Sequence, residues 1–435
     1  MKSYITFLGI ALTALASARA VDMLSCSPGE NASKEARFVW HSADKSCVLY
    51  CAPASRPNSP IVIPATKVYK PVAFRNNDVD YWKYTAETSK LRPDTEYIYW
   101  VKSLSETSRR HRFKTGGTKG QCNFLWMSDV HANPGEPDKM KTVELLLKDG
   151  EELASSSKGL DFVLFSGDAT KFGSRYDNWQ QWNSSRVVTD YMFAMVPGNK
   201  EYYLRGRGTF NDYNWYLAVR NNPPNGPSAK ELEGCYWFIR DGVMFVGIDS
   251  MVSKGKLMAR YGDKANVLKD QTEWFDRVVS AQRGKFKYLV VFQHDPWFVY
   301  AKSKDEFDKS RGYYDAWRNV FDKHKVDLAL SGDEHNYIRT KPLRGDNAAK
   351  DGTIYLVAGQ IEAKNYGATV TSDIRSIVNA NVQKYIDCLG ATDASCGACL
   401  IEVRPNALKL TYFWNRWQEP KIKIYDTVMV APKKR

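Results

Sequence analysis

Apolar residues in this chain gather in five short runs that each end in polar side chains. The runs are FLWMSDVH ending at His131, DFVLFSGD ending at Asp168, YMFAMVPGNK ending at Lys200, KYLVVFQH ending at His294, and VDLALSGDEH ending at His335. Short apolar runs bounded by Gly, Pro or polar residues predict buried strands. Ligands of an open α/β sheet bind beyond the carboxyl ends of its strands, so we expect these polar side chains to converge on one point.

Two regions of the chain differ in pattern. Residues 21–116 hold short β-type runs with turn residues between them, which predicts a small antiparallel sandwich, and the sequence TGGTKG at 115–120 predicts a linker. From residue 121 to 435, apolar strands alternate with helical stretches at 139–153, 271–281 and 315–323, as in an α/β domain. Hairpins are expected at 236–250, with Asp241-Gly242 at the turn, and at 400–414, with a further strand at 353–359.

The first twenty residues predict a secretory signal peptide. Lys2 begins a short basic segment, residues 5–15 are mostly apolar, and Ala18-Arg19-Ala20 fits a cleavage site. This apolar stretch is too short to span a bilayer, and no later segment reaches about 18 consecutive apolar residues. We therefore expect an exported protein without a transmembrane segment, located outside the cell or in the lumen of the secretory pathway.

Composition adds a size and a charge to this picture. A chain of 435 residues with 43% hydrophobic residues can form two or three domains with sizeable cores. The net charge of +13 favours anionic substrates, but the basic residues are spread along the sequence. We therefore favour a generally basic surface over a dedicated polyanion groove, and we expect no specific binding of nucleic acid. The oligomeric state stays open.

The eight cysteines all follow the predicted cleavage point. An even number of cysteines in an exported chain favours disulfides, with one bridge expected within residues 26–51 and another within 388–399. Cys396-Gly-Ala-Cys399 could alternatively belong to a zinc or redox site, but no second CxxC accompanies it. Asn31 and Asn183 stand in glycosylation tripeptides, which is a weak signal.

The ends of the five runs carry a set of metal-binding side chains. Asp129 and His131 are two residues apart, so both can face one cation, and Asp168 follows a glycine that lets the backbone approach a ligand. Asn199, His294 and His335 add oxygen and nitrogen donors. This mixture without thiolates suits manganese, iron or zinc. The other histidines, His41, His111 and His324, lack this context and are interpreted as structural.

The blocks SDVH, GDAT, GNKE, QHDPW and GDEHNYIR resemble, in order, the five motifs of calcineurin-type metallophosphoesterases, and most closely those of purple acid phosphatases. The sandwich region and the C-terminal segment from GACLIEV to KIYDTVMV are similar to the corresponding parts of plant-type members. The resemblance implies an α/β fold with an N-terminal fibronectin-III-like β-sandwich and a four-layer αββα metallophosphoesterase domain that ends in a C-terminal hairpin.

The resemblance also implies two metal ions. Site A would consist of Asp129, His131, the bridging Asp168, and His335. Site B would consist of Asp168, Asn199, His294 and Asp333. Asp333 stands where the family has histidine, and Lys171 stands at the position of the tyrosine that colours purple members, so we expect no tyrosinate band.

Lys200 is the most consequential departure, because it occupies the histidine of the Gly-Asn-His-Glu motif. That histidine contacts phosphate and assists the leaving group in the family. A lysine can hold phosphate, but its reference pKa of about 10.4 makes it a poor proton donor near neutral pH. Protonation of the leaving group would then fall to water, Glu201 or Glu334. Lys200 could instead pair with Asp333, which would leave one ion in site A, or it could point to solvent.

The first hypothesis is a secreted acid-phosphatase-like enzyme. It would hydrolyse phosphate monoesters of small molecules or other anionic substrates by attack of a metal-bound hydroxide, with activity altered by Lys200 and Asp333. The alternative is a catalytically inactive pseudophosphatase that acts as a secreted binding protein. A phosphodiesterase or nucleotide hydrolase would share the same core and differ in loops such as 205–230.

Overall fold

The computed structural model describes residues 21–69, 74, 81–156, 159–204, 215–227, 234–251, 264–299, 304–357, 361, 384–389, 397–416 and 419–435. The predicted signal peptide, residues 1–20, lies outside the described residues, as do Cys396 and residues 205–214 and 228–230 of the loop 205–230. Among the described helices, none has both the length and the apolar character needed to cross a membrane.

The N-terminal region is a sandwich of two antiparallel sheets. One sheet has the order β1 (Val21–Pro28), β2 (Ala36–Ser42), β6 (Trp82–Thr88), β5 (Lys67–Tyr69), and the other has the order β4 (Ile61–Pro64), β3 (Cys47–Pro53), β7 (Glu96–Ser103), β8 (His111–Lys114). Along β7 the buried positions alternate, and the ring of Tyr99 meets that of Phe38 on the facing sheet at 5.3 Å. The sandwich predicted for this region is therefore present.

The following region contains a six-stranded sheet. Its order is β11 (Met192–Met195), β10 (Phe162–Phe165), β9 (Cys122–Met127), β21 (Gly397–Val403), β22 (Leu408–Arg416), β23 (Glu419–Val430). The first three strands are parallel, and the C-terminal hairpin joins them in antiparallel sense. Helices α1 (Asp138–Ser155), α2 (Tyr176–Asn183) and α3 (Arg186–Thr189) supply the apolar cover of its outer face.

A seven-stranded sheet packs against the first. Its order is β12 (Tyr236–Arg240), β13 (Val243–Gly247), β14 (Tyr288–Phe292), β15 (Leu328–Ser331), β19 (Ile354–Val357), β16 (Ile338–Thr340), β20 (Ile386–Leu389). Helices α6 (Lys264–Ala281) and α7 (Lys304–His324) cover its outer face. Short elements complete the described chain: η1 (Asn199–Tyr202), α4 (Trp215–Val219), β17 (Leu343–Arg344) and β18 (Asn347–Ala348).

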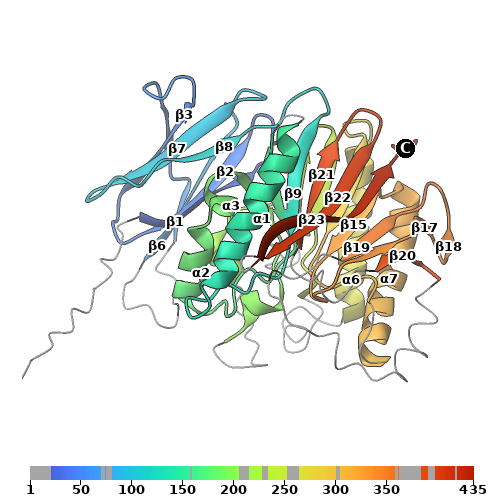
Figure 1. Cartoon of the computed structure of the whole chain (residues 1–435). Helices are drawn as coiled ribbons and strands as arrows, with labels where there is room; N and C mark the ends of the chain where they lie inside the picture. The colour runs from blue at the N-terminus through green and yellow to red at the C-terminus, as the bar shows by residue number, and fades with distance from the viewer. Residues whose placement is uncertain are drawn as a thin grey trace, which may run out of the picture.

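The core between the two sheets explains why the strands read as continuous apolar runs. The rings of Phe124 and Phe162 in one sheet each meet Phe245 of the other sheet at 5.3 Å. A strand with one face in this interface and the other face under helices is buried on both sides. Its sequence therefore lacks the polar residues that alternate with apolar ones in a half-exposed strand. The result is the predicted order of layers, helix, sheet, sheet, helix, beside the N-terminal sandwich (Figure 1). The domain boundaries remain predictions.

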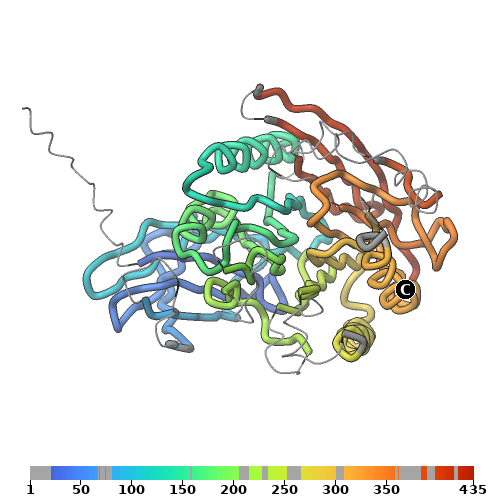
Figure 2. Tube along the Cα trace, turned by 90° about the horizontal axis from the view of Figure 1, so that it is seen from below, coloured from blue at the N-terminus to red at the C-terminus, as the bar shows by residue number. Residues whose placement is uncertain are grey.

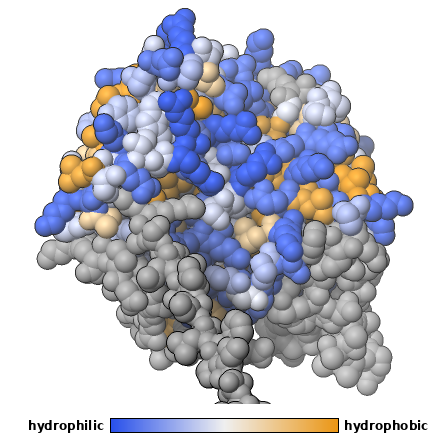
Figure 3. All heavy atoms as spheres, turned by 60° about the vertical axis from the view of Figure 1, so that its left-hand side comes forward, coloured by the Kyte–Doolittle hydropathy of each residue, from blue (hydrophilic) through white to orange (hydrophobic). Residues whose placement is uncertain are grey.

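The molecule is elongated, with the sandwich at one end and the C-terminal strands at the other (Figure 2). The face on the sandwich side is mostly hydrophilic, and its hydrophobic side chains lie in small separate groups (Figure 3). The predicted helices at 139–153, 271–281 and 315–323 are confirmed within α1, α6 and α7. The hairpin turn at Asp241-Gly242 is confirmed as well, with φ of 50° and 73° at its two residues.

Two predictions about modification need correction. Seven cysteines are described and all are free thiols, so the predicted bridge within 26–51 is not formed. Cys26 and Cys51 are fully buried and fill the sandwich core as small apolar side chains. Asn183 is buried, and its amide donates to the Trp179 carbonyl and accepts from Arg220, so it is a poor glycan acceptor. Asn31 is exposed.

Candidate metal centre

All seven residues predicted as ligands lie together where the apolar strands end. They follow β9, β10, β11, β14 and β15, which come from both central sheets. Backbone hydrogen bonds hold the loops in register, since the amide of Asp129 donates to the Gly167 carbonyl at 3.1 Å and that of His131 to the Asp168 carbonyl at 3.0 Å. The seven residues are Asp129, His131, Asp168, Asn199, His294, Asp333 and His335.

The first half of the centre gathers around Asp129. Its Oδ1 lies 3.4 Å from Nε2 of His335 and 3.9 Å from Nε2 of His131, while its Oδ2 accepts a hydrogen bond from the amide of Asp333 at 3.0 Å. Asp129 is fully buried, and Oδ1 makes no hydrogen bond. A buried carboxylate oxygen without a hydrogen bond is costly unless a cation compensates it, which is a reason to place an ion at this point.

The second half of the centre gathers around His294. Its Nδ1 donates to the Ser166 carbonyl at 2.8 Å, so Nε2 is the ring atom that faces the centre, and its lone pair is available to an ion when Nε2 is unprotonated. Nε2 lies 3.4 Å from Oδ1 of Asp168, 3.1 Å from Oδ1 of Asn199 and 3.6 Å from Oδ1 of Asp333. A shared cation would hold these four atoms together as ligands, and without one a proton on Nε2 of His294 takes its place.

The amide of Asn199 fits the centre in either of two orientations. Its Oδ1 faces Asp168 and His294, which offer acceptors, while its Nδ2 faces the ammonium group of Lys200. Rotating the amide would let its oxygen accept from Lys200 at 2.9 Å and its nitrogen donate to Oδ2 of Asp168 at 3.1 Å. The rotated orientation satisfies these groups without an ion, whereas an ion between Asn199, Asp168 and His294 would require the amide oxygen to face them.

Backbone strain is concentrated at these ligand positions. Among the described residues nine that are not glycine have positive φ, and five of them belong to the centre. Strained conformations of this kind cost about 1–3 kcal/mol each and persist where the surroundings enforce them, commonly at functional sites. The five are Asp129, His131, Asp168, Asp333 and His335, with φ between 52° and 70°.

Two glycines allow the loops to approach so closely. A Cβ at Gly167, where φ is 93°, would lie 2.7 Å from the amide nitrogen of Gly198 and 2.9 Å from Nδ1 of His294. A Cβ at Gly332 would lie 2.5 Å from Oδ2 of Asp129. No side chain fits at either position without moving a ligand.

Lys200 points into the centre, not to solvent. Its Nζ lies 3.5 Å from Oδ2 of Asp168 and 4.8 Å from the centre of the Tyr203 ring, and its side chain is 25% exposed. Burial lowers the pKa of Lys200, but the nearby carboxylate of Asp168 outweighs burial and raises it. Lys200 is therefore a fixed positive charge beside the predicted bridging ligand. Asp333 lies toward His294, so the expected pairing of Lys200 with Asp333 is not the dominant contact.

The opposite charges of Asp168 and His294 also shift the pKa of each group. Burial raises the pKa of Asp168, but the charges of His294 and Lys200 and a hydrogen bond from His131 outweigh burial and hold that pKa well below its usual range. Burial lowers the pKa of His294, and Asp168 more than reverses this effect. The centre thus keeps Asp168 ionised, as a bridging ligand must be.

Glu201 binds backbone amides of the loops around the centre. It therefore does not serve as the proton donor to the leaving group. It is fully buried, and its carboxylate accepts from the amides of Gly198 at 2.7 Å, Asp168 at 2.8 Å and Thr170 at 3.2 Å. Burial, together with the charge of Asp168, raises the pKa of Glu201 to about 7. Sequence reasoning missed this role because the partners are backbone groups that leave no motif.

Lys171 lies away from the centre. Its ammonium group forms an ion pair with Glu136, which Lys139 also approaches. Within the described residues, the position that carries the colour-giving tyrosine in purple members is therefore occupied by a cation directed elsewhere.

The donor atoms form two groups that share Asp129, whereas the resemblance implies Asp168 as the bridge. Asp129, His131 and His335 can hold one ion, and Asp129, Asp168 and His294 can hold another, with the ligand atoms in each group within 4.8 Å of one another. Imidazole nitrogens and carboxylate oxygens suit iron, manganese or zinc. Asp333 is partly exposed, with 29% of its side chain accessible, and it lies outside both groups.

Comparisons with known proteins agree with this geometry. Residues 122–337 match the model of the calcineurin-like phosphoesterase family. An uncharacterized protein of Mycobacterium tuberculosis is 25% identical over 350 residues, which cover 73% of this chain and 61% of that protein. Purple acid phosphatase 21 of Arabidopsis thaliana is 29% identical over 278 residues, covering 62% of this chain and 56% of that protein. A probable inactive purple acid phosphatase of the same plant is 22% identical, covering 63% and 48%.

The chain spans about half to three fifths of the length of these curated relatives. A purple acid phosphatase from seeds of yellow lupin (Lupinus luteus) shares the fold, with a TM-score of 0.68 at 17% identity over 95% of this chain and 74% of that chain. The family model and these relatives identify the chain as a purple acid phosphatase-like member of the calcineurin-like phosphoesterase family.

Proposed function

We propose that this protein is an exported, metal-dependent phosphoesterase that hydrolyses phosphate monoesters. The observation that carries the proposal is the convergence of seven donor side chains from five strand ends on one point, with buried acceptors facing each other there. Ions bound at this point would polarise the phosphate oxygens and lower the pKa of water, which is the chemistry that phosphate ester hydrolysis requires.

The position of each residue in the centre suggests its role. Asp168 would bridge the two ions, because its Oδ2 faces His131 and its Oδ1 faces His294. Glu201 would position this bridge from behind by holding the amides of Asp168 and Gly198. We propose iron, manganese or zinc as the ions, in agreement with the mixed nitrogen and oxygen donors.

Lys200 would bind the substrate phosphate as a point charge. Its ammonium group lies on the side of the centre where Asp168 presents Oδ2, and its raised pKa keeps it charged near neutral pH. A group held in this state is a poor proton donor, so protonation of the leaving group falls to water or to Glu334, which is buried and lies between Asp333 and His335 in the sequence. The loss of a matched general acid costs about 10²- to 10⁴-fold in rate, and we expect a slow enzyme with a preference for good leaving groups.

Phosphate release from an aryl phosphate tests this function. The chain should release phosphate in the presence of manganese, iron or zinc, and Asp168→Asn should remove the activity. A matched control is Asp276→Asn, which changes a carboxylate on α6 that pairs with Lys323 and His324. Equal turnover in the Asp168→Asn variant would contradict the proposal.

A second candidate function rests on the same lysine. The contact of 3.5 Å between Lys200 and Asp168 neutralises part of the charge that would attract an ion, which would suit a binding protein without turnover. That candidate predicts no metal-dependent release of phosphate from any aryl phosphate, in the wild type or in Lys200→His. Recovery of activity in Lys200→His would instead show that the centre is intact and that only the proton donor is lacking.

A further inference from the structure

A basic pocket lies at the opposite end of β14 and β15 from the candidate metal centre. It has a volume of about 170 Å³ and lies beside Lys325 and Phe286, which come shortly before the two strands begin. His294 and Asp333 follow the other ends of the same strands. Phe286 and His294 are eight positions apart, as are Lys325 and Asp333, and eight residues of extended chain span roughly 26 Å, so the two regions are separate.

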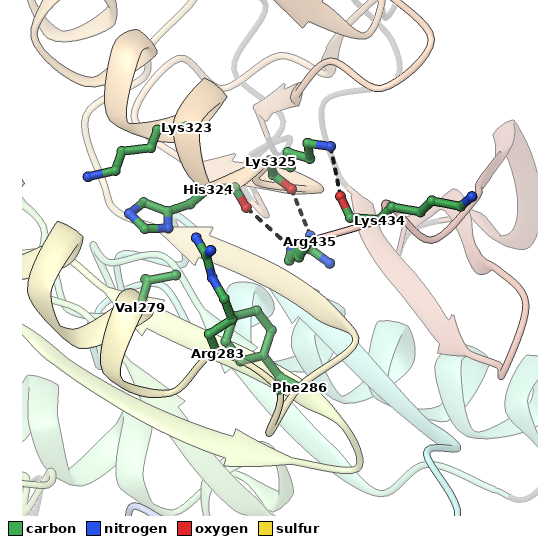
Figure 4. Close-up of a pocket in the computed structure, with 9 residues that line it drawn as sticks. Val279, Arg283, Phe286, Lys323, His324, Lys325, Lys434 and Arg435 are labelled. Atoms are coloured by element: carbon green, nitrogen blue, oxygen red, sulfur yellow. Dashed lines mark hydrogen bonds between the residues drawn. The ribbon is translucent and has the colours of Figure 1, made fainter.

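Two cations are fixed at the floor of this pocket. The guanidinium of Arg435 donates to the carbonyls of His324 at 3.2 Å and Lys325 at 2.7 Å, and it lies 5.7 Å from the centre of the Phe286 ring. The ammonium group of Lys325 donates to the Lys434 carbonyl at 2.7 Å (Figure 4). Arg435 also pairs with the buried Asp327, which balances part of its charge, whereas the carbonyl that holds Lys325 leaves the charge of that ammonium group uncompensated.

Exposed cations form the rim of the pocket. In Figure 4 the guanidinium of Arg283 extends toward His324 and Arg435, while Lys323 and Lys434 diverge to opposite sides. Lys285 and Lys287 continue the exposed basic surface along the same loop. A single small anion cannot reach all of these groups, so their arrangement suits a ligand with repeated charges.

Acidic groups compensate only part of this charge. Asp276 pairs with Lys323 and lies 2.6 Å from His324, and the fully buried Asp327 pairs with Arg435. Within the described structure, Arg283 and Lys434 form no ion pair. The lining of the pocket itself contains no acidic residue. A surplus of positive charge therefore faces solvent at this end of the molecule.

The charge is assembled from three distant segments, 283–287, 323–325 and 433–435. In the sequence these basic residues look dispersed. Folding brings the segments together because Arg435 also contacts the Lys287 carbonyl and Lys433 contacts those of Val326 and Gly352.

We propose that this pocket and its rim bind a linear polyanion with repeated phosphate groups. Arginine forks match the oxygens of a phosphate group, and the diverging lysines can follow a chain of such groups in both directions. The proposal does not depend on the metal centre, because none of its residues contributes a metal ligand. Binding by this surface would hold the protein on a polyanion and leave the metal centre accessible.

Binding of inorganic polyphosphate, measured against salt concentration, tests the proposal. The triple variant Arg283→Ala, Lys323→Ala, Lys434→Ala removes three exposed cations from the rim. The control variant Lys45→Ala, Lys90→Ala, Lys102→Ala removes the same charge from exposed positions of the sandwich. Because all six residues are exposed, both variants should keep the melting temperature of the wild type, and a shared Asp168→Asn background removes turnover at the metal centre.

We expect the affinity of the rim variant for polyphosphate to fall at least about tenfold at low salt. The negative slope of log K against log salt should become shallower by about two. The affinity of the control variant for polyphosphate should stay within about twofold of that of the protein with an unchanged rim. Equal losses in both variants would show attraction to net charge alone and would overturn the proposal. Binding of orthophosphate as strong as that of polyphosphate, at equal phosphate concentration, would overturn the requirement for repeated groups. The single variant Arg283→Ala provides an independent measurement if the triple variant does not fold.

Discussion

The ammonium group of Lys200 lies 3.5 Å from Oδ2 of Asp168, the same oxygen that lies 3.1 Å from Nε2 of His131. This carboxylate is therefore shared between a fixed cation and a predicted metal ligand. The contact holds a positive charge where a substrate phosphate would arrive. Lys200 keeps its proton, whereas the histidine that the family has at this position could give its proton up.

Lys200→His should raise the rate of hydrolysis of alkyl phosphates, which need a protonated leaving group. An imidazole has a pKa near neutrality and can supply that proton, so we expect a gain of about tenfold or more at pH 6. The measurement is kcat for an alkyl and an aryl phosphate. Lys171→His is the matched control, because that lysine pairs with Glu136 away from the centre. A gain that is equal for both substrates, or equal in the control, would contradict the assigned role.

Glu201→Gln should destabilise the protein and weaken metal binding together. Both carboxylate oxygens accept backbone N–H groups, whereas glutamine offers one oxygen and turns an NH₂ group toward a donor. Hydrogen bonds to a charged group contribute about 1.5–3 kcal/mol each, so we expect a loss of about 2 kcal/mol in the free energy of unfolding. Glu136→Gln, at a partly exposed ion pair, should lose less than about 1 kcal/mol. Denaturant titration with and without metal measures both effects, and equal losses in the two variants would refute the role of Glu201.

Gly167→Ala and Gly159→Ala separate backbone strain from steric conflict. Both glycines have positive φ, 93° and 80°, but a Cβ at Gly159 meets nothing within 4 Å. Gly159→Ala should cost about 1 kcal/mol, the usual penalty of alanine at positive φ. Gly167→Ala should cost more, because its Cβ would press on Gly198 and His294, and it should also reduce the metal content. Similar melting temperatures for the two variants would contradict this account of the close approach.

Stability should fall as the pH decreases from about 6.5 to 4, with His41 as one cause. Burial lowers the pKa of His41 to about 4, and its Nε2 lies 2.8 Å from the Ala218 carbonyl. The folded pKa is below the unfolded value, so the unfolded state binds the proton first, and the contribution of His41 is complete only above about pH 6.5. The full shift corresponds to roughly 3 kcal/mol. Unfolding free energies measured across this pH range should depend less on pH in His41→Gln, and an unchanged dependence would contradict the prediction.

Local patterns were sufficient to predict the strands and to predict that the candidate ligands follow them. Strands buried on both faces read as unbroken apolar runs, and the residue that follows each run lies at the sheet edge where ligands bind. The hairpin at Asp241-Gly242 was readable for a similar reason, because its turn requires two residues with positive φ.

Contacts between distant segments were not readable from the sequence. β21 pairs with β9 although Cys399 and its partner Trp126 are far apart in the chain. The direction of Lys200, the backbone partners of Glu201, the burial of Asn183 and the gathering of Arg283, Lys325 and Arg435 all depend on such contacts. None of them leaves a periodic signal, because each is set by the packing of separate elements.

The metal content of the purified chain tests the central claim most directly. After incubation with manganese, iron or zinc and removal of free ions, elemental analysis should find two ions per wild-type chain and at most one in Asp168→Asn. A wild-type chain that retains no ion, or an Asp168→Asn variant that retains as many as the wild type, would contradict the assignment of these seven side chains to a metal centre.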